Sequence, residues 1–155
     1  MKKLTPLFVA MAAALVLFFL WSARLWPFDG HPEPVDVPLA ELTVEHDAVR
    51  VSGTAHYPVR VTQERQGRFG HLGGTWYVFP LFEKGDTMSR SIRVIVATPV
   101  PIDDLAQYED MTVEGYALPS PAAMTPSSED MFLNEGYSFT EDYFVVEAWP
   151  PEAAP

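Results

Sequence analysis

The first hydrophobic pattern in the sequence is an uninterrupted apolar segment, residues 4 to 21 (LTPLFVAMAAALVLFFLW), which carries no charged side chain. A helix of this length covers roughly 27 Å at about 1.5 Å per residue, close to the roughly 30 Å hydrocarbon core of a bilayer. We therefore expect one membrane-spanning helix in contact with the lipid bilayer. Its expected anchoring side chains, with two tryptophans near the outer headgroups, are Leu7, Phe8, Leu15, Leu17, Phe18, Phe19, Trp21 and Trp26.

Charge around this apolar segment predicts its direction. Lys2 and Lys3 precede it, whereas only Arg24 follows it closely. Positively charged residues that flank a span stay on the cytoplasmic side. We therefore expect a single-pass protein of the bacterial inner membrane, with a cytoplasmic N-terminus and a C-terminal domain that is periplasmic or otherwise extracytoplasmic.

Two other interpretations of the segment remain open. A cleaved signal peptide needs small residues at the last and third-last positions before the cut. A cut after Ala23 would put Trp21 at the third-last position, and a cut after Ala14 would leave LVLFFLW on the mature chain. A buried core helix is the third interpretation, but such a helix is rarely apolar all round at the very start of a chain. An uncleaved anchor fits the pattern best.

Beyond residue 44 the pattern changes to short segments in which apolar and polar residues alternate, as is typical of β-strands. One segment, TWYVFPLF, is apolar on both faces, which predicts a central strand or a strand at an interface. In another, Ile92, Val94 and Val96 share one side. The predicted strands are 48–63, with interruptions at Gly53 and at 56–58, then 75–82, 90–98, 111–118 and 142–149.

The connections between these strands carry spacer, turn and helix signals. Residues 27 to 38 (PFDGHPEPVDVP) hold four prolines and three acids, which predicts an extended spacer outside the core. Residues 39 to 42 are expected to form a short helical turn or an edge segment. Residues 102 to 110 predict a short helix with Asp103 as its N-cap, and residues 119 to 130 are loop-like in composition.

Composition is consistent with a single β domain after the anchor. Fifteen prolines and nine glycines predict many breaks, and the absence of cysteine leaves the domain to be held by its core alone. We predict a mainly β fold: an OB-like five-stranded small barrel with one short helix, preceded by one N-terminal transmembrane helix. The expected divisions are an anchor at 1–26, a Pro-rich spacer at 27–44, the OB-like domain at 45–149 and a Pro-rich tail at 150–155.

The element order carries a resemblance to a known fold. Strand, strand, strand, short helix, strand, strand, with a bend at Gly53 in the first strand, resembles the OB-fold, a five-stranded Greek-key barrel. The resemblance covers residues 45 to 149 and rests on that order and on the strands VRVSGTA and MTVEGYAL. It implies that the loops 64–74 and 119–141 flank the usual OB binding face.

Two membrane-anchored bacterial families resemble this layout. The haem chaperones of cytochrome c maturation have one N-terminal span and an exported OB domain, but their haem histidine lies near the C-terminal end of the barrel, and this sequence has no histidine after His71. The surfeit-type cytochrome oxidase assembly factors show a run similar to GHLGGTWYVFPLF followed by a VEG-type strand, although they carry a second span and an Arg-Gly-Trp motif that are absent here. Both resemblances imply service to a membrane complex.

Charge is distributed unevenly along the chain. After residue 28 there are 21 acidic and seven basic residues, a net charge of −14, and all seven basic residues lie between Arg50 and Arg93. A uniformly anionic C-terminal third argues against nucleic acid as a partner. A local basic face remains open.

No motif predicts catalysis or metal binding. The four histidines, at positions 31, 46, 56 and 71, match no compact ligand pattern, and there is no cysteine. The acid pairs 103–104, 109–110 and 129–130 are more typical of helix caps and solvated turns than of general acids or calcium ligands. We therefore predict a protein that is not an enzyme and has no metal and no cofactor.

The loop 64–74 and the strand after it predict a contact surface, because arginine and large aromatic side chains are enriched at protein interfaces. The alternatives are a hairpin loop without a partner and contact with anionic lipid headgroups. A later segment with Met124, Met131, Phe132 and Tyr137 either docks on a neighbouring subunit or folds back over the domain. The predicted contact residues are Arg65, Arg68, Phe69, His71, Trp76, Tyr77 and Phe79.

These observations favour a single-pass, membrane-anchored accessory or structural subunit of a larger integral membrane complex of respiratory or photosynthetic type. Two alternatives stay open. One is a transient assembly or maturation factor for such a complex, and the other is a small-ligand-binding domain.

Overall fold

The computed structural model describes residues 31–65, 73–103, 105–119 and 124–150. The chain divides into two compact units, residues 1–32 and Glu33–Pro155, and the second unit is called the β domain below. The predicted span at residues 4–21 and its anchoring side chains lie outside the described residues. In the part that is described, no helix is long and apolar enough to cross a membrane.

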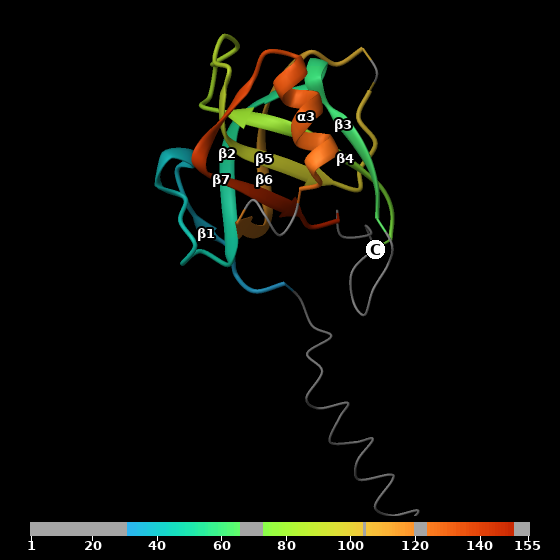
Figure 1. Ribbon diagram of the computed structural model, residues 1–155. Coiled ribbons are helices and arrows are strands. Elements are labelled where there is room, and N and C mark those ends of the chain that lie inside the picture. Colours follow the sequence, from blue (N-terminus) through green and yellow to red (C-terminus); the bar gives the residue numbers. More distant parts are fainter. Residues whose placement is uncertain (1–30, 66–72, 104, 120–123, 151–155) are drawn as a thin grey trace, which may run out of the picture. The chain divides into compact units, whose positions relative to one another are not determined.

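The β domain is mainly β, with one short α-helix (Figure 1). Each predicted strand has a counterpart in it, because period-two alternation marks a strand that is buried on one face. Its elements are β1 (Val35–Asp36), η1 (Leu39–Glu41), β2 (Ala48–His56), η2 (Tyr57–Val59), β3 (Val61–Arg65), β4 (Gly74–Phe82), β5 (Ser91–Thr98), β6 (Tyr108–Pro119), α3 (Pro126–Asn134) and β7 (Ser138–Ala148).

The strand pairings form a closed circuit. β2 pairs with β6, β6 with β7, β7 with β5 and β5 with β4, and β4 returns to β2 through Thr54 opposite Phe82 and Ala55 opposite Leu81. The β5–β7 pair is parallel and the other pairs of the circuit are antiparallel. β2 serves two partners because it bends past Gly53, whose Cα faces the carbonyl of Phe82. β1 and β3 are the two end strands of the sheet order.

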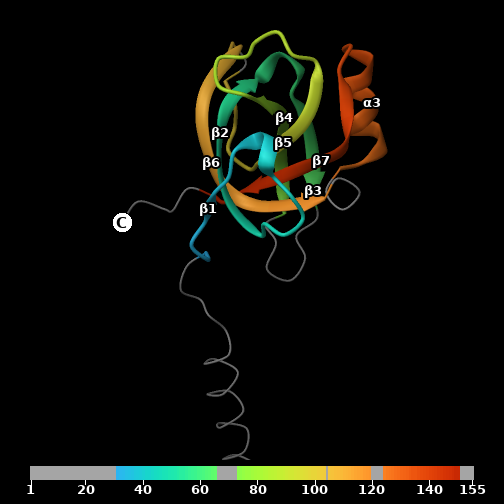
Figure 2. The same ribbon diagram turned by 90° about the vertical axis from the view of Figure 1, so that its left-hand side faces the viewer.

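Two hydrophobic clusters lie on opposite faces of these strands. The first, inside the circuit, includes Val51, Phe79 and Val94. The second includes Val78, Ile95 and Phe132, and lies under α3, which packs outside the strands (Figure 2). β4 contributes to both clusters, so its two-sided apolar sequence reflects a central strand with a helix over its outer face.

Part of the predicted spacer belongs to the folded domain. Val35 and Asp36 pair in parallel with Val49 and Arg50. Val37, Leu39 and Leu42 are buried in the inner cluster. The expectation that residues 27–38 stay outside the core is therefore wrong for Val37, because frequent prolines also permit an extended edge strand.

The helix prediction was wrong in position. Residues 108–110 begin β6, and Asp103 caps only a turn by accepting a bond of 2.8 Å from the amide of Leu105. The α-helix lies at Pro126–Asn134, where a loop was expected. Its start nevertheless follows the usual signals, because Thr125 caps the amide of Ser128 and Pro126 occupies the first turn.

A β-bulge in the pairing of β5 with β7 changes which face of the sheet the side chains of β5 occupy. Ile92 lies opposite Phe139 but Val94 lies opposite Phe144, so the pairing skips residues 140–143 of β7. Val94 packs inside the circuit, whereas Ile92 packs in the cluster under α3. The expectation that Ile92 shares a side with Val94 is therefore wrong, because a bulge interrupts the alternation.

Candidate functional site

The predicted contact surface is largely part of the core. Trp76 is 6% exposed and Phe79 is 1% exposed, which corrects their assignment as contact residues. The guanidinium of Arg65 pairs with Glu147 of β7 and lies 4.5 Å over the ring of Trp76. Tyr77 is half-buried on β4. Arg68, Phe69 and His71 lie outside the described residues, so the structure does not bring the predicted set together as one exposed face.

The segment from Met124 to Tyr137 folds back over its own domain, which is one of the two roles that the sequence left open for it. Met124, Phe132 and Tyr137 are buried in the cluster under α3. Gln63 of β3 donates a bond of 2.6 Å to Ser128 and so ties the helix to the strands. Met131 remains about half exposed. The face of β4 and β5 that α3 covers is therefore closed to a partner in this fold.

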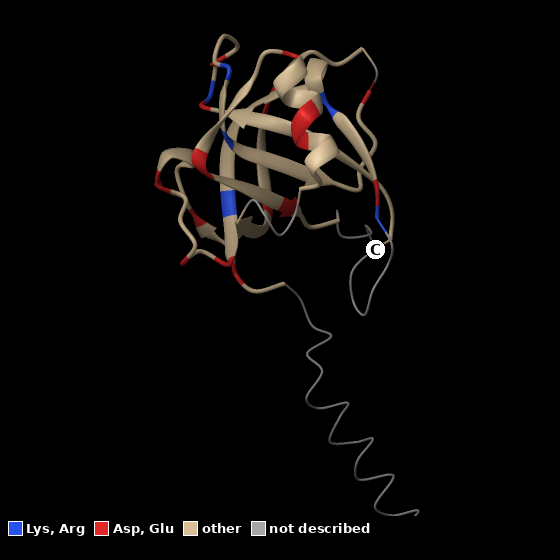
Figure 3. Cartoon of the chain, viewed as in Figure 1, with Lys and Arg blue, Asp and Glu red and all other residues tan. Residues whose placement is uncertain are grey.

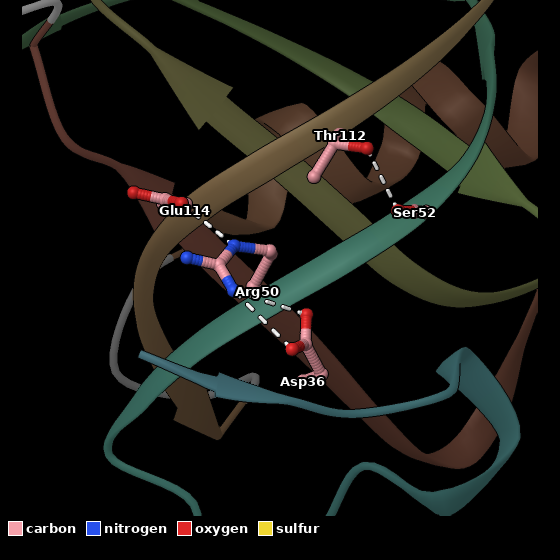
Figure 4. Close-up of polar contacts among 5 residues, drawn as sticks. All are labelled: Asp36, Arg50, Ser52, Thr112 and Glu114. Carbon is pink, nitrogen blue, oxygen red and sulfur yellow. Dashed lines mark hydrogen bonds and ion pairs between the residues drawn. The ribbon is translucent and has the colours of Figure 1, made fainter. Parts of the chain in front are cut away.

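A ladder of cross-strand polar pairs runs along the outer face of β2 and β6. The guanidinium Nε of Arg50 donates to Glu114 at 2.7 Å, and its Nη1 lies 3.2 Å from Asp36 of β1 (Figure 4). The next pair is Ser52 with Thr112, at 2.8 Å. Bonding to Glu114 and then to Asp36 raises the pKa of Arg50. The ladder clamps β1, β2 and β6 together, although ion pairs as exposed as these contribute little to stability.

The ladder ends at a fully buried histidine, His56. Its Nε2 lies 2.8 Å from the backbone oxygen of Asp86, and because a carbonyl only accepts, Nε2 must carry a proton. Its Nδ1 lies 3.3 Å from the hydroxyl of Tyr137, whose pKa is raised by burial. The ring also contacts Phe82 and Tyr108. With no exposed surface, His56 holds the β4–β5 turn in place and offers no atom to a substrate.

Asp86 makes the stability of the β4–β5 turn depend on pH. Its carboxylate accepts bonds from the Ser89 hydroxyl at 2.5 Å and from the amides of Ser89 and Met88. These bonds, the Ser89 hydroxyl first, lower the pKa of Asp86 below its ordinary value of 3.8. The carboxyl of Asp86 therefore binds a proton more readily in the unfolded chain than in the folded domain. The stabilisation of the folded domain by Asp86 is complete when the pH is above the ordinary pKa, and it is lost as the pH falls through the pKa of the folded state.

We expect the Tm of the wild type to fall more steeply below about pH 4 than that of the Asp86→Asn variant. The matched control is Asp142→Asn, because Asp142 is exposed and has no hydrogen bond within the described residues. That control should keep the wild-type slope in thermal unfolding followed by circular dichroism. Equal slopes for wild type and Asp86→Asn would contradict the assigned role.

A cavity of about 440 Å³ opens beside the β5–β7 bulge. Arg93 lies at the bulge, with Nε bonded to the carbonyl of Leu39 and Nη2 to that of Leu42, both at 3.1 Å. The cavity is lined by Leu42, Thr43, Val44, Arg93, Pro119, Glu141, Asp142, Tyr143 and Phe144. The sequence pattern did not reveal this site, because nothing local signals the parallel pairing of β5 with β7 that creates it.

Metal chemistry has no support within the described residues, where no group of three or more histidine or acidic side chains is placed to hold an ion. Comparisons with protein-family models, with curated proteins and with solved structures found no match. Function is therefore inferred from the charges, burial and contacts of the β domain, and no family is assigned.

Proposed function

We propose that the protein is a membrane-anchored accessory or structural subunit of a larger integral membrane complex of respiratory or photosynthetic type, anchored by residues 4–21. Its exported β domain binds the partner through an anionic surface. The alternative of a transient assembly or maturation factor uses the same surface and differs only in how long contact lasts.

The observation that carries the proposal is that the described arginines are engaged within their own domain. Arg50 and Arg65 pair with carboxylates, Arg60 and Arg93 bond backbone carbonyls, and Arg90 lies over the ring of Tyr137. Figure 3 shows acidic residues spread over the outer loops and strands of the domain. Exposed carboxylates that contact no cation within the described residues include Glu41, Glu45, Asp47, Asp130, Glu135, Glu141 and Asp142.

The consequence is a partner with a basic surface. The net charge beyond residue 28 is −14, and the five described arginines are already engaged within the domain. Charges of opposite sign across an interface mainly increase the rate of association and its specificity, and this attraction is screened by salt. Among the described basic residues, Lys84 alone is exposed with no recorded partner, which does not support a broad basic face in the described part of the domain.

The OB-like barrel remains our interpretation of the closed strand circuit. In favour of it, the five strands of the circuit pair in the order 1-2-3-5-4-1 when β2, β4, β5, β6 and β7 are renumbered 1 to 5 in chain order, and the third and fifth of them are parallel. In an OB-fold the face of the second and third strands is the usual binding face. Here α3 covers that face, which supports a protein partner elsewhere and gives no support to nucleic acid.

A small-ligand-binding domain is the second candidate function. The cavity beside the β5–β7 bulge favours it, since it combines an oriented guanidinium with an apolar lining. Its volume lies within the roughly 300–1,000 Å³ typical of ligand pockets.

The subunit proposal predicts fixed-ratio co-migration with a large complex when native membranes are solubilised in mild detergent and run on a native gel with mass-spectrometric identification. Raising salt from about 0.1 to about 1 M shortens the Debye length from about 10 to about 3 Å and should release the chain. Replacing Glu41, Glu45 and Asp47 by glutamine, or Asp130 and Glu135 by asparagine and glutamine, should lower retention in at least one variant.

The control for this experiment is Lys84→Gln, which makes the exposed β4–β5 turn more acidic and should preserve retention. Substoichiometric co-migration, with loss of the complex when the chain is deleted, would favour the assembly factor. Migration of the chain alone at low salt would contradict both versions of the proposal.

A further inference from the structure

Arg93 is held in a fixed orientation at the edge of the cavity. The bulge leaves it opposite residues 140–143 of β7, without a regular ladder partner. Two carbonyls of the segment after η1, those of Leu39 and Leu42, accept from Nε and Nη2. Within the described residues Nη1 has no partner. A guanidinium whose plane is already fixed loses little entropy when it binds an anion.

Two carboxylates line the same cavity without neutralising Arg93. Glu141 and Asp142 are exposed, and neither comes within the 4.0 Å that defines an ion pair with any described cation. The cavity therefore presents one cation and two anions that are separated from each other. A ligand that carries both charges can satisfy both sides, whereas a simple anion is repelled by the carboxylates and a simple cation by the guanidinium.

The remaining lining is mostly apolar. Val44 is 72% exposed on the wall of the cavity, and Pro119, Tyr143 and Phe144 complete it. Covering such surface is favourable at roughly 25 cal/mol per Å². The volume of about 440 Å³ suits a molecule of amino-acid size with an apolar side chain.

We propose that this cavity binds a small zwitterion with an apolar portion. Its carboxylate or phosphate contacts Arg93, its ammonium group contacts Glu141 and Asp142, and its apolar part covers Val44. The inference rests on the second candidate function, ligand binding, and is independent of the subunit proposal. Two sources share this chemistry, a free apolar amino acid and the headgroup of phosphatidylethanolamine.

The test measures binding to the purified full-length chain in nonionic detergent by isothermal titration calorimetry. The probes are leucine, N-acetyl-leucine, leucine amide, glycerophosphoethanolamine and glycerophosphocholine. We expect one zwitterion with a primary ammonium to bind. Removing either charge of leucine should weaken binding at least about tenfold, because hydrogen bonds to charged groups are strong.

Variants locate the site. Glu141→Gln combined with Asp142→Asn should weaken binding at least about tenfold without changing the Tm, because both side chains are exposed. Arg93→Gln should abolish binding, and Arg93→Lys should restore it in part if the domain stays folded. The matched control, Asp130→Asn with Glu135→Gln on and after α3, removes the same charge away from the cavity and should bind like the wild type.

The outcomes separate the sources and the proposals. Binding of leucine alone assigns a free amino acid, and binding of glycerophosphoethanolamine alone assigns a lipid headgroup. Equal binding of the blocked leucines, an unchanged affinity in the double acid variant, or no binding of any probe would overturn the inference. None of these results bears on co-migration with a complex, so failure here and failure of the subunit proposal are distinguishable.

Discussion

Replacing Phe132 by alanine is expected to lower the free energy of unfolding of the β domain by about 3–5 kcal/mol, the usual cost of deleting a buried aromatic ring. Phe132 is fully buried and is the central contact of α3 with the strands. Its ring packs edge-on to Phe139 of β7, with centroids 6.1 Å apart. Losing it leaves a cavity under a short helix that has few other buried side chains, so α3 should also fray.

Urea unfolding followed by far-UV circular dichroism provides the measurement, with tryptophan fluorescence, to which Trp76 of the same cluster contributes, as a second probe. Met131→Ala and Leu133→Ala are the matched controls, because these neighbours on the same helix are 51% and 49% exposed. Each should cost less than about 1 kcal/mol. Equal costs at all three positions would show that α3 does not pack as described.

Replacing Gly115 by alanine is expected to destabilise the domain by about 3 kcal/mol or more, at the upper end of overpacking effects. A Cβ at Gly115 would lie 2.1 Å from the carbonyl oxygen of Glu147 and 2.7 Å from its carbon. These are backbone atoms held by the β6–β7 pairing, so they cannot move aside as a flexible side chain could. Gly53→Ala should act in the same way, because its Cβ would lie 2.2 Å from the carbonyl oxygen of Phe82.

The control for both glycines is Ser52→Ala, next to Gly53 on the exposed face of β2. It removes one hydrogen bond to Thr112 and should cost about 1 kcal/mol. Circular dichroism and the Tm of each variant decide the comparison. Gly115→Ala with a wild-type Tm would mean that β6 and β7 do not approach as closely as the structure has them.

All the strands except β1 could be predicted from the sequence, because each carries its own signal, whereas the two residues of β1 are too few to alternate. Alternation in β2 and β6 reflects one face turned to the core, whereas β5 is an apolar segment buried on both faces, and Gly53 marks the bend of β2. The sequence does not predict α3, because its proline and serines are typical of loops, although Thr125 and Pro126 together are also a helix-start signal. The low helix propensity of the whole segment outweighs this single cap signal when the sequence alone is considered.

The site residues needed information that no local pattern contains. A two-sided apolar strand fits an interface and a helix-covered core equally well, so the sequence alone does not place Trp76 in the core. Arg65 meets Glu147 across 82 positions of sequence, and Arg93 meets the carbonyls of Leu39 and Leu42 across 54 and 51. Such contacts follow from the order of the closed circuit, in which β5 and β7 pair in parallel.

The closed circuit also bears on self-association. Free strand edges recruit other chains and start aggregation, and proteins limit this with short or charged edge strands. The two end strands of this sheet are β1, with two residues, and β3, whose last residues are Glu64 and Arg65. The domain thus offers little free edge for stacking copies into fibrils, even when neighbouring molecules are crowded together.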